Sequence, residues 1–302
     1  MTGREWGLIG TLSLLWGGAF FFIALGLEGF PPNTLVLVRM AIASLPLLLL
    51  VRLTGERLPR DAASWASLAL LGFLNVALPF ILFTWGQTRI SSGLASVLNA
   101  TTPLWGVLAA HFLTHDERAT PARVAGALLG FAGVGVMIGT DLSGGFSGSL
   151  LAQIACLVAT LCFALAVIYA RRFDKSGMSP VVVATGQVVT AAIIMLPIAF
   201  ITDAPWQLPM PGNRAILGTV ALALLSTSLS YVLFFRLLKS AGVNNTLLIA
   251  FLMPIVAIAL GAAFLGEVMA PRHFAGIALI ALGLAVIDGR PFRALARTLN
   301  VP

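Results

Sequence analysis

Apolar residues fill this chain in long runs, and polar or charged residues gather in the short breaks between them. Each run is close to the about 20 residues that an α-helix needs to cross the hydrocarbon core of a bilayer. The pattern predicts an all-α integral membrane protein with ten transmembrane helices, at approximately residues 6–27, 33–51, 64–86, 91–113, 122–140, 148–170, 179–201, 213–236, 243–265 and 272–288.

Composition supports this interpretation. Of the 302 residues, 59% are apolar and only 10% are charged, against about 45–50% and about 25% in ordinary soluble domains. A soluble enzyme, a disulfide-stapled secreted domain and a disordered chain are therefore excluded. The sequence has no Walker-type phosphate-binding loop, which argues against built-in ATP hydrolysis. Cys156 and Cys162 are six positions apart on different helix faces, so we expect neither a disulfide nor a metal site, and no cofactor.

The basic residues are distributed unevenly over the predicted loops. In a soluble protein, a net charge of +7 would suggest nucleic acid as the partner. In this chain the positions of the cations relative to the predicted membrane spans give another explanation. Alternate loops collect 14 of the 18 Lys and Arg residues, and cytoplasmic loops are the ones enriched in these residues. Both termini are therefore predicted to be cytoplasmic, with residues 290–302 as a short basic tail. We expect contact with membrane lipid and no nucleic acid.

The two halves of the sequence resemble each other. Residues 117–139 align with residues 267–289 at an offset of 150, with one Glu, one Pro and three Gly in register. Pro103 and Pro254 continue the match at an offset of 151, as Pro46 and Pro197 do. The sequence thus predicts two repeats, at 1–140 and 148–289. Because each repeat contains five helices, the second is inverted in the membrane relative to the first, as in many secondary transporters.

The motifs resemble those of the EamA family of the drug/metabolite transporter superfamily over nearly the full chain. The residues that carry the resemblance are a first-helix LWG-x-x-F pattern, a second-helix arginine and a repeated P…E…G signature, at Leu15–Phe20, Arg39, Pro103, Glu117, Gly126, Pro254, Glu267 and Gly276. The bacterial amino-acid and metabolite exporters within that superfamily are the most similar. The resemblance implies ten helices in two repeats, a central cavity open to one side at a time, and export of small metabolites.

Two prolines at matched positions are candidates for a hinge. Pro103 and Pro254 each fall near the middle of a predicted span, where proline removes a backbone donor. Either they mark a hinge or cavity, or they are prolines that a membrane helix tolerates. Glu117 and Glu267 stand at the turns before later helices and are interpreted as structural contacts at helix starts.

Polar side chains inside the spans are candidates for lining a cavity. Asn99 shares one helix face with Ser92 and Ser96, and that face should point inward because lipid leaves an amide unsatisfied. Asn99 either binds a ligand or joins two helices. A second face of this kind carries Thr227 and Ser230.

Aromatic residues are expected around the same cavity. A cavity rich in rings offers stacking and cation–π surfaces to a ligand. Trp16 lies about 15 Å along its helix, too deep for an interfacial anchor. The predicted cavity aromatics, placed by helix faces and by the repeat, are Trp16, Phe20, Phe80, Phe83, Phe163, Tyr231 and Phe234. For Phe163 plain packing is the alternative.

Arg39 is the one cation that lies well inside a predicted span rather than at its end. A charge at membrane depth is costly and is often functional. Arg39 either reaches outward to the surface and to carbonyl groups, or acts as a gate or contact for a ligand carboxylate. Gln187 occupies the equivalent place in the second half, at an offset of 148, and is a further cavity candidate.

These features predict a bacterial inner-membrane exporter of small metabolites, with amino acids, especially aromatic and other apolar ones, as the expected substrates. No Asp or Glu lies in the middle of a predicted span, so facilitated export by alternating access is favoured over proton coupling. The alternatives are an exporter of cationic drugs and a passive pore. An enzyme is not expected, and the protein is predicted to be a monomer or a weak dimer.

Overall fold

The structure is a computed structural model that describes residues 2–113, 120–138, 148–241 and 248–289. Within these ranges every regular element is helical and no strand occurs. Nine segments of the described chain are long and apolar enough to cross a membrane: Gly3–Leu27 (α1), Pro32–Leu53 (α2), Ala62–Gly86 (α3, η1, α4), Ser92–Leu113 (α5, α6), Pro121–Ile138 (α7), Gly148–Phe173 (in α8, which continues to Ser176), Pro180–Asp203 (α9), Asn213–Leu237 (α10, η3 and most of α11) and Pro271–Asp288 (α14).

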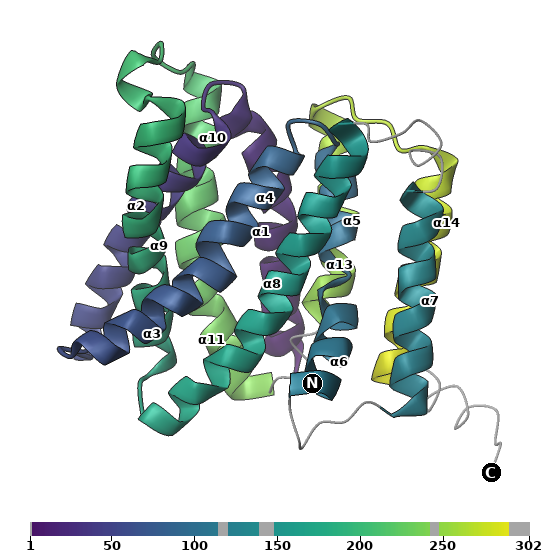
Figure 1. Cartoon of the computed structure of the whole chain (residues 1–302), viewed down its shortest axis with the longest axis horizontal. Helices are drawn as coiled ribbons and strands as arrows, with labels where there is room; N and C mark the ends of the chain where they lie inside the picture. Colours follow the sequence, from purple (N-terminus) through teal and green to yellow (C-terminus); the bar gives the residue numbers. More distant parts are fainter. Residues whose placement is uncertain (1, 114–119, 139–147, 242–247, 290–302) are drawn as a thin grey trace.

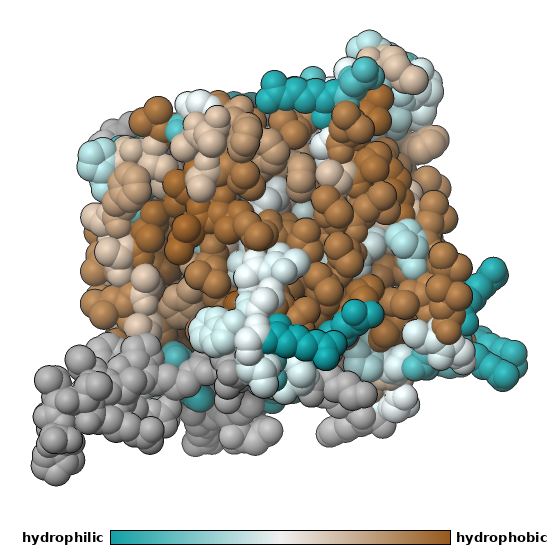
Figure 2. All heavy atoms as spheres, turned by 180° about the vertical axis from the view of Figure 1, so that it is seen from behind, coloured by the Kyte–Doolittle hydropathy of each residue, from teal (hydrophilic) through white to brown (hydrophobic). Residues whose placement is uncertain are grey.

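A tenth apolar helix, α13 (Leu248–Phe264), is shorter and follows residues outside the described ranges. The described helices agree with the ten predicted spans and confirm the all-α membrane fold. The predicted tail at 290–302 and Glu117 lie outside the described residues. One broad face of the molecule is covered by apolar side chains, and hydrophilic residues gather toward two opposite ends (Figure 2). This distribution is the one that a bilayer requires.

The packing of the helices in the two halves is related by an inverted two-fold symmetry. Helix α7 packs against α14 at one edge of the bundle and α2 packs against α9 at the other (Figure 1). Helix α1 packs against α13 and α10, while its counterpart α8 packs against α5, α6 and α4. Because these main contacts of one half have equivalents in the other, the repeat seen in the sequence is also a repeat of packing.

Glycines allow α7 and α14 to approach each other closely. A Cβ atom added at Gly126 would lie 2.6 Å from the carbonyl oxygen of Gly283, and one added at Gly133 would lie 2.7 Å from that of Gly276. No side chain fits at such distances, so the two backbones are in direct contact. The spacing of seven residues in each helix thus forms a seam inside one subunit.

Two π-helical turns interrupt matched spans. Segment η1 (Phe73–Ala77) separates α3 (Ala62–Gly72) from α4 (Leu78–Gly86), and η3 (Leu224–Leu229) separates α10 (Asn213–Ala223) from α11 (Ser230–Ala241). Their first residues are 151 positions apart, the same offset as the matched prolines. Such turns widen the helix locally and often mark functional sites. They were not predicted from the sequence.

The two matched prolines lie in different surroundings. Helix α5 (Ser92–Asn99) ends before α6 (Thr102–Leu113), and Pro103 lies in the first turn of α6. At this break the hydroxyls of Thr101 and Thr102 donate to the carbonyls of Leu98 and Asn99, at 2.7 and 2.8 Å. Pro254, in contrast, lies inside the continuous helix α13. Within the described chain the break beside the proline therefore occurs in the first half and has no equivalent in α13. The hinge role of both prolines stays a prediction.

Substitution of Gly283 by Ala tests the seam. The new Cβ would lie 2.5 Å from the carbonyl oxygen of Gly126 and 2.7 Å from the backbone nitrogen of Gly130, so α7 and α14 must separate. We expect the free energy of unfolding in detergent to fall by about 1–3 kcal/mol. Gly135→Ala in α7 is the control, because nothing lies within 4 Å of its added Cβ. Equal unfolding free energies for Gly283→Ala and wild type would contradict the seam.

Candidate functional site

Arg39 of α2 is held inside the bundle. Its side chain is only 5% exposed. The Nε group donates to the hydroxyl of Thr227 in η3 at 3.0 Å, and the guanidinium carbon lies 3.8 Å from the centre of the Phe80 ring. A cation–π contact is stronger where water is excluded. The guanidinium thus contacts the second half of the chain and does not turn outward to the surface.

A second polar contact is the counterpart of the first. The side-chain amide of Asn75 in η1 donates to the amide oxygen of Gln187 in α9 at 2.9 Å. Each contact joins a π-helical turn of one half to the α2 or α9 helix of the other half. The repeat superimposes Arg39 on Gln187, so one contact carries a charge and the other is neutral. Asn75 was not predicted, although an amide in an apolar span was a usable signal, as it was for Asn99.

The Asn75–Gln187 pair borders a cavity of about 250 Å³. Its walls come from α3, η1, α8, α9 and α11, and its residues are Leu71, Asn75, Ala166, Val167, Ala170, Phe173, Met178, Pro180, Val183, Ala184, Gln187, Tyr231, Phe234 and Phe235. Residues such as Phe173 and Pro180 place it toward the end of the bundle where α1 begins, which we call the near end. Three predicted cavity residues, Gln187, Tyr231 and Phe234, line it. The lining contains no charged side chain.

Other predicted aromatics form a connected cluster beside this cavity. Phe83 stacks on Phe163 at 6.0 Å between ring centres and meets Phe20 edge-on at 5.7 Å. Phe80 meets Phe163 at 6.3 Å. The structure brings all four together, but Phe20 and Phe83 are only 6% and 3% exposed, so they pack behind the cavity and do not line it.

Of the remaining residues predicted for the site, one contacts the cavity lining and the others have different roles or positions. Trp16 packs against Phe234 at 5.4 Å between ring centres and so touches a lining residue. The Ser230 hydroxyl donates to the carbonyl of Leu225 at 2.9 Å, which satisfies the backbone of the π-helical turn. Asn99 is half-buried at the end of α5 and is not a lining residue of the cavity.

At the opposite, far end of the bundle, polar contacts join the two halves. The Asp203 carboxylate, at the end of α9, accepts from the backbone N–H and hydroxyl of Thr34 at 2.7 and 2.9 Å and from the Asn33 amide at 3.2 Å. It therefore caps α2 from the other half. Arg214 and Glu28 form an ion pair at 3.5 Å.

Glu267 makes a similar contact at the far end. Its carboxylate accepts from the backbone N–H and hydroxyl of Ser92 at 2.7 and 2.9 Å, and from the N–H of Gly93 at 3.1 Å. The glutamate was interpreted as a structural contact at a helix start. That role is seen, and the helix it caps is α5 of the first half.

Comparison with known proteins identifies the family. The model of the EamA-like transporter family matches residues 6–139 and matches again at residues 150–288. The chain belongs to this family. The two matches cover the two halves that the structure relates by inverted packing. An EamA-like transporter is a multi-pass membrane protein of the drug/metabolite transporter type, as the sequence predicted.

Relatives of this EamA-like transporter are membrane transporters. The uncharacterized transporter YdfC of Bacillus subtilis is 30% identical over 84% of this chain and 81% of its own. A probable terminal-alkyne amino-acid exporter of Streptantibioticus cattleyicolor is 29% identical over 94% and 93%. The uncharacterized inner membrane transporter YedA of Escherichia coli K12 is 25% identical over 93% and 89%. A solved crystal structure has the same fold, with a TM-score of 0.66 and 20% identity over 95% of this chain and 98% of that one.

A double-mutant cycle tests the contact between Asn75 and Gln187. Asn75→Ala leaves the buried amide of Gln187 without its partner, and Gln187→Ala leaves the half-buried amide of Asn75 without its partner. The loss of a partner costs a buried amide about 1–3 kcal/mol. We expect the double variant to lose clearly less unfolding free energy than the two single losses together. Unfolding in detergent measures all four proteins, and Asn213→Ala, an exposed amide at the start of α10, is the control. Strict additivity would show that the two amides do not interact.

Proposed function

We propose that this transporter exports small zwitterionic, partly apolar metabolites, with amino acids as its main substrates, by facilitated alternating access. The observation that carries the proposal is the cavity at the near end. Its lining combines the neutral amides of Asn75 and Gln187 with aromatic rings, and it holds no carboxylate. Amides donate to a carboxylate and accept from an ammonium group, while rings pack against an apolar side chain.

The size of the cavity and the relatives support this substrate class. A volume of about 250 Å³ is below the about 300–1,000 Å³ of pockets for drug-sized ligands, which favours a small metabolite. The relative from Streptantibioticus cattleyicolor is a probable exporter of a terminal-alkyne amino acid. A cationic-drug exporter is the weaker candidate, because a cation would find no acidic partner in this lining. A passive pore is the third.

Arg39 is proposed as the gate and as a contact for the substrate carboxylate. In this conformation its guanidinium is engaged by Thr227 and Phe80. A movement of α2 away from η3 would release it. A substrate carboxylate is a stronger partner than a neutral hydroxyl, so the substrate favours the conformation in which the Arg39–Thr227 contact is open.

The proposal places the protein in a bacterial inner membrane as a monomer or weak dimer, with both termini and the near end in the cytoplasm. The Lys and Arg residues of the alternate loops support this orientation. The cavity would then receive its substrate from the cytoplasm, as export requires.

Flux into proteoliposomes tests the function. We expect saturable, exchangeable flux of neutral apolar amino acids and none of a cationic dye, at the same rate with and without an imposed pH gradient. Phe234→Ala, which removes a lining ring, should lower flux several-fold, whereas the exposed Asn213→Ala should not. Flux that strictly requires a pH gradient would overturn facilitation, unsaturable flux would indicate a pore, and transport of the dye alone would reject the amino-acid proposal.

The far end is proposed to be the closed gate in this conformation. Asp203 caps α2 across the two halves there. Gly55 and Ala204 both have a positive φ and are 149 positions apart in the sequence. At this offset Thr54 is the residue of the first half that corresponds to Asp203. Thr54 has no carboxylate, so this position cannot cap α9 at the near end as Asp203 caps α2 at the far end. This difference favours the state that is closed at the far end and open to the cavity.

A cysteine reporter tests this gate. Thr219 of α10 is 1% exposed, and its hydroxyl lies 3.1 Å from where a Cβ on Gly26 of α1 would be. We expect Asp203→Ala to speed the labelling of a Thr219→Cys reporter by an impermeant maleimide about fivefold, since a helix cap contributes about 1 kcal/mol. Cys156 and Cys162 are replaced by Ala beforehand.

The matched control removes a cap at the near end. The Asp61 carboxylate accepts from the backbone N–H of Ser64 at 2.7 Å and caps α3 within its own half. Asp61→Ala should leave the labelling of the reporter unchanged. If both aspartate variants speed labelling equally, general destabilisation explains the effect and the gate at the far end is rejected.

A further inference from the structure

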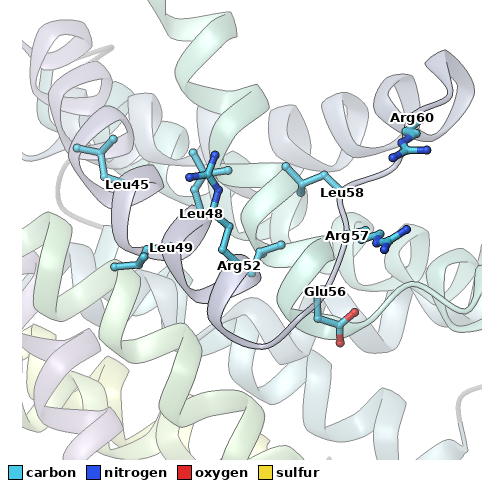
Figure 3. A pocket seen from close by; sticks show the side chains of 9 residues that line it. Leu45, Leu48, Leu49, Arg52, Glu56, Arg57, Leu58 and Arg60 are labelled. Carbon is cyan, nitrogen blue, oxygen red and sulfur yellow. The ribbon is translucent and has the colours of Figure 1, made fainter.

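A groove at the near end combines arginines with exposed leucines (Figure 3). Its volume is about 540 Å³, larger than that of the substrate cavity. It lies between the end of α2 and the loop that leads to α3, and its lining is Leu45, Leu48, Leu49, Val51, Arg52, Glu56, Arg57, Leu58 and Arg60. None of these residues takes part in the proposed transport site.

The apolar side of the groove faces lipid. Leu45 and Leu49 are one turn apart on α2 and are 66% and 55% exposed. Arg52 follows at the next turn of the same helix face. A surface of this kind presents hydrocarbon to an acyl chain and, at its end, a guanidinium to the headgroup region.

Local contacts fix the shape of the loop. Gly55 has a φ of +72°, the left-handed conformation that ends a helix and that glycine adopts at little cost. At the other end of the loop the Trp65 indole donates to the carbonyl of Pro59 at 2.9 Å, and Asp61 caps α3. The groove is thus a built feature of the fold, with both ends of its loop tied down.

The groove carries positive charge that is exposed and can bind an anion. Arg52, Arg57 and Arg60 are exposed, and no carboxylate of the described chain forms an ion pair with any of them. Glu56 is the one acidic residue in the lining. Guanidinium groups bind phosphate oxygens through paired hydrogen bonds.

The equivalent loop of the second half lacks this charge. Residues 204–212 follow α9 as residues 55–61 follow α2, and they contain no Lys or Arg. The left-handed residue there is Ala204, with a φ of 44°. Of these two related loops of the described chain, only the one after α2 therefore forms a basic groove, although the inverted repeat would allow two.

We propose that this groove binds the phosphate headgroup of an anionic phospholipid from the leaflet at the near end, with one acyl chain along Leu45 and Leu49. Basic pockets at the cytoplasmic side of membrane proteins bind anionic headgroups in this way. The inference rests on the membrane placement of α2 and does not depend on which metabolite is transported.

Lipid titration of the purified full-length protein is the test. The protein in phosphatidylcholine–detergent micelles is titrated with phosphatidylglycerol, and bound lipid is counted by native mass spectrometry while thermal unfolding is followed in parallel. We expect R52Q/R57Q/R60Q to weaken phosphatidylglycerol binding at least about tenfold, because each arginine near an anionic surface contributes about 1 kcal/mol. The single variants should show graded losses, which keeps the test valid should the triple variant not fold.

A matched control removes the same number of arginines elsewhere. R4Q/R123Q/R236Q changes three exposed residues on the same predicted side, outside the groove, and should keep wild-type binding. The proposal is overturned if both triple variants lose phosphatidylglycerol binding equally, because the lipid would then respond to the total positive charge on this side of the membrane and not to the groove. It is also overturned if phosphatidylcholine binds equally well, or if inorganic phosphate alone reproduces the thermal shift.

Discussion

Satisfaction of backbone hydrogen bonds inside hydrocarbon is the constraint on which the rest of this structure depends. A carbonyl or N–H group without a partner costs several kcal/mol there, so a helix can be interrupted only where another group supplies the missing bond. The hydroxyls of Thr101 and Thr102 do so at the break between α5 and α6. Ser230 does so beside η3. The irregular segments thus lie where short polar side chains are available.

A symmetric scaffold carries an asymmetric site. The α7–α14 seam and the α2–α9 contact relate the two halves, yet the paired positions differ in chemistry. Arg39 corresponds to Gln187, and a broken span in the first half corresponds to a continuous α13 with Pro254. Asp203 has Thr54 as its counterpart. If the two halves had identical side chains, the inward-open and outward-open states would be equal in free energy. The differences between the halves allow one of these states to have the lower free energy.

Much of the fold could be predicted from the sequence, because hydropathy, matched prolines and glycine spacing are local and periodic signals. The glycines of the seam are an example of such a signal, because their spacing of seven puts them on one helix face and permits close approach. The spacing does not tell whether the partner helix belongs to the same subunit, and the structure shows that it does. The π-helical turns could not be predicted, because nothing in the run Phe73–Ala77 distinguishes a wide turn from a regular one. Helix faces predicted Tyr231 and Phe234 and the repeat offset predicted Gln187, but neither signal could tell lining residues from Phe20 and Phe83 one layer deeper.

The burial of Arg39 has an electrical consequence. Arg39 carries a positive charge, and its Cα lies about 10 Å along α2 from the start of the helix, inside the region across which a living membrane maintains its voltage. A unit charge that crosses the whole field changes free energy by about 2.3 kcal/mol per 100 mV. Even a carrier of electrically neutral molecules would therefore respond to membrane voltage if opening the Arg39–Thr227 contact displaces this charge along the field, and energised and de-energised cells would populate its two states differently.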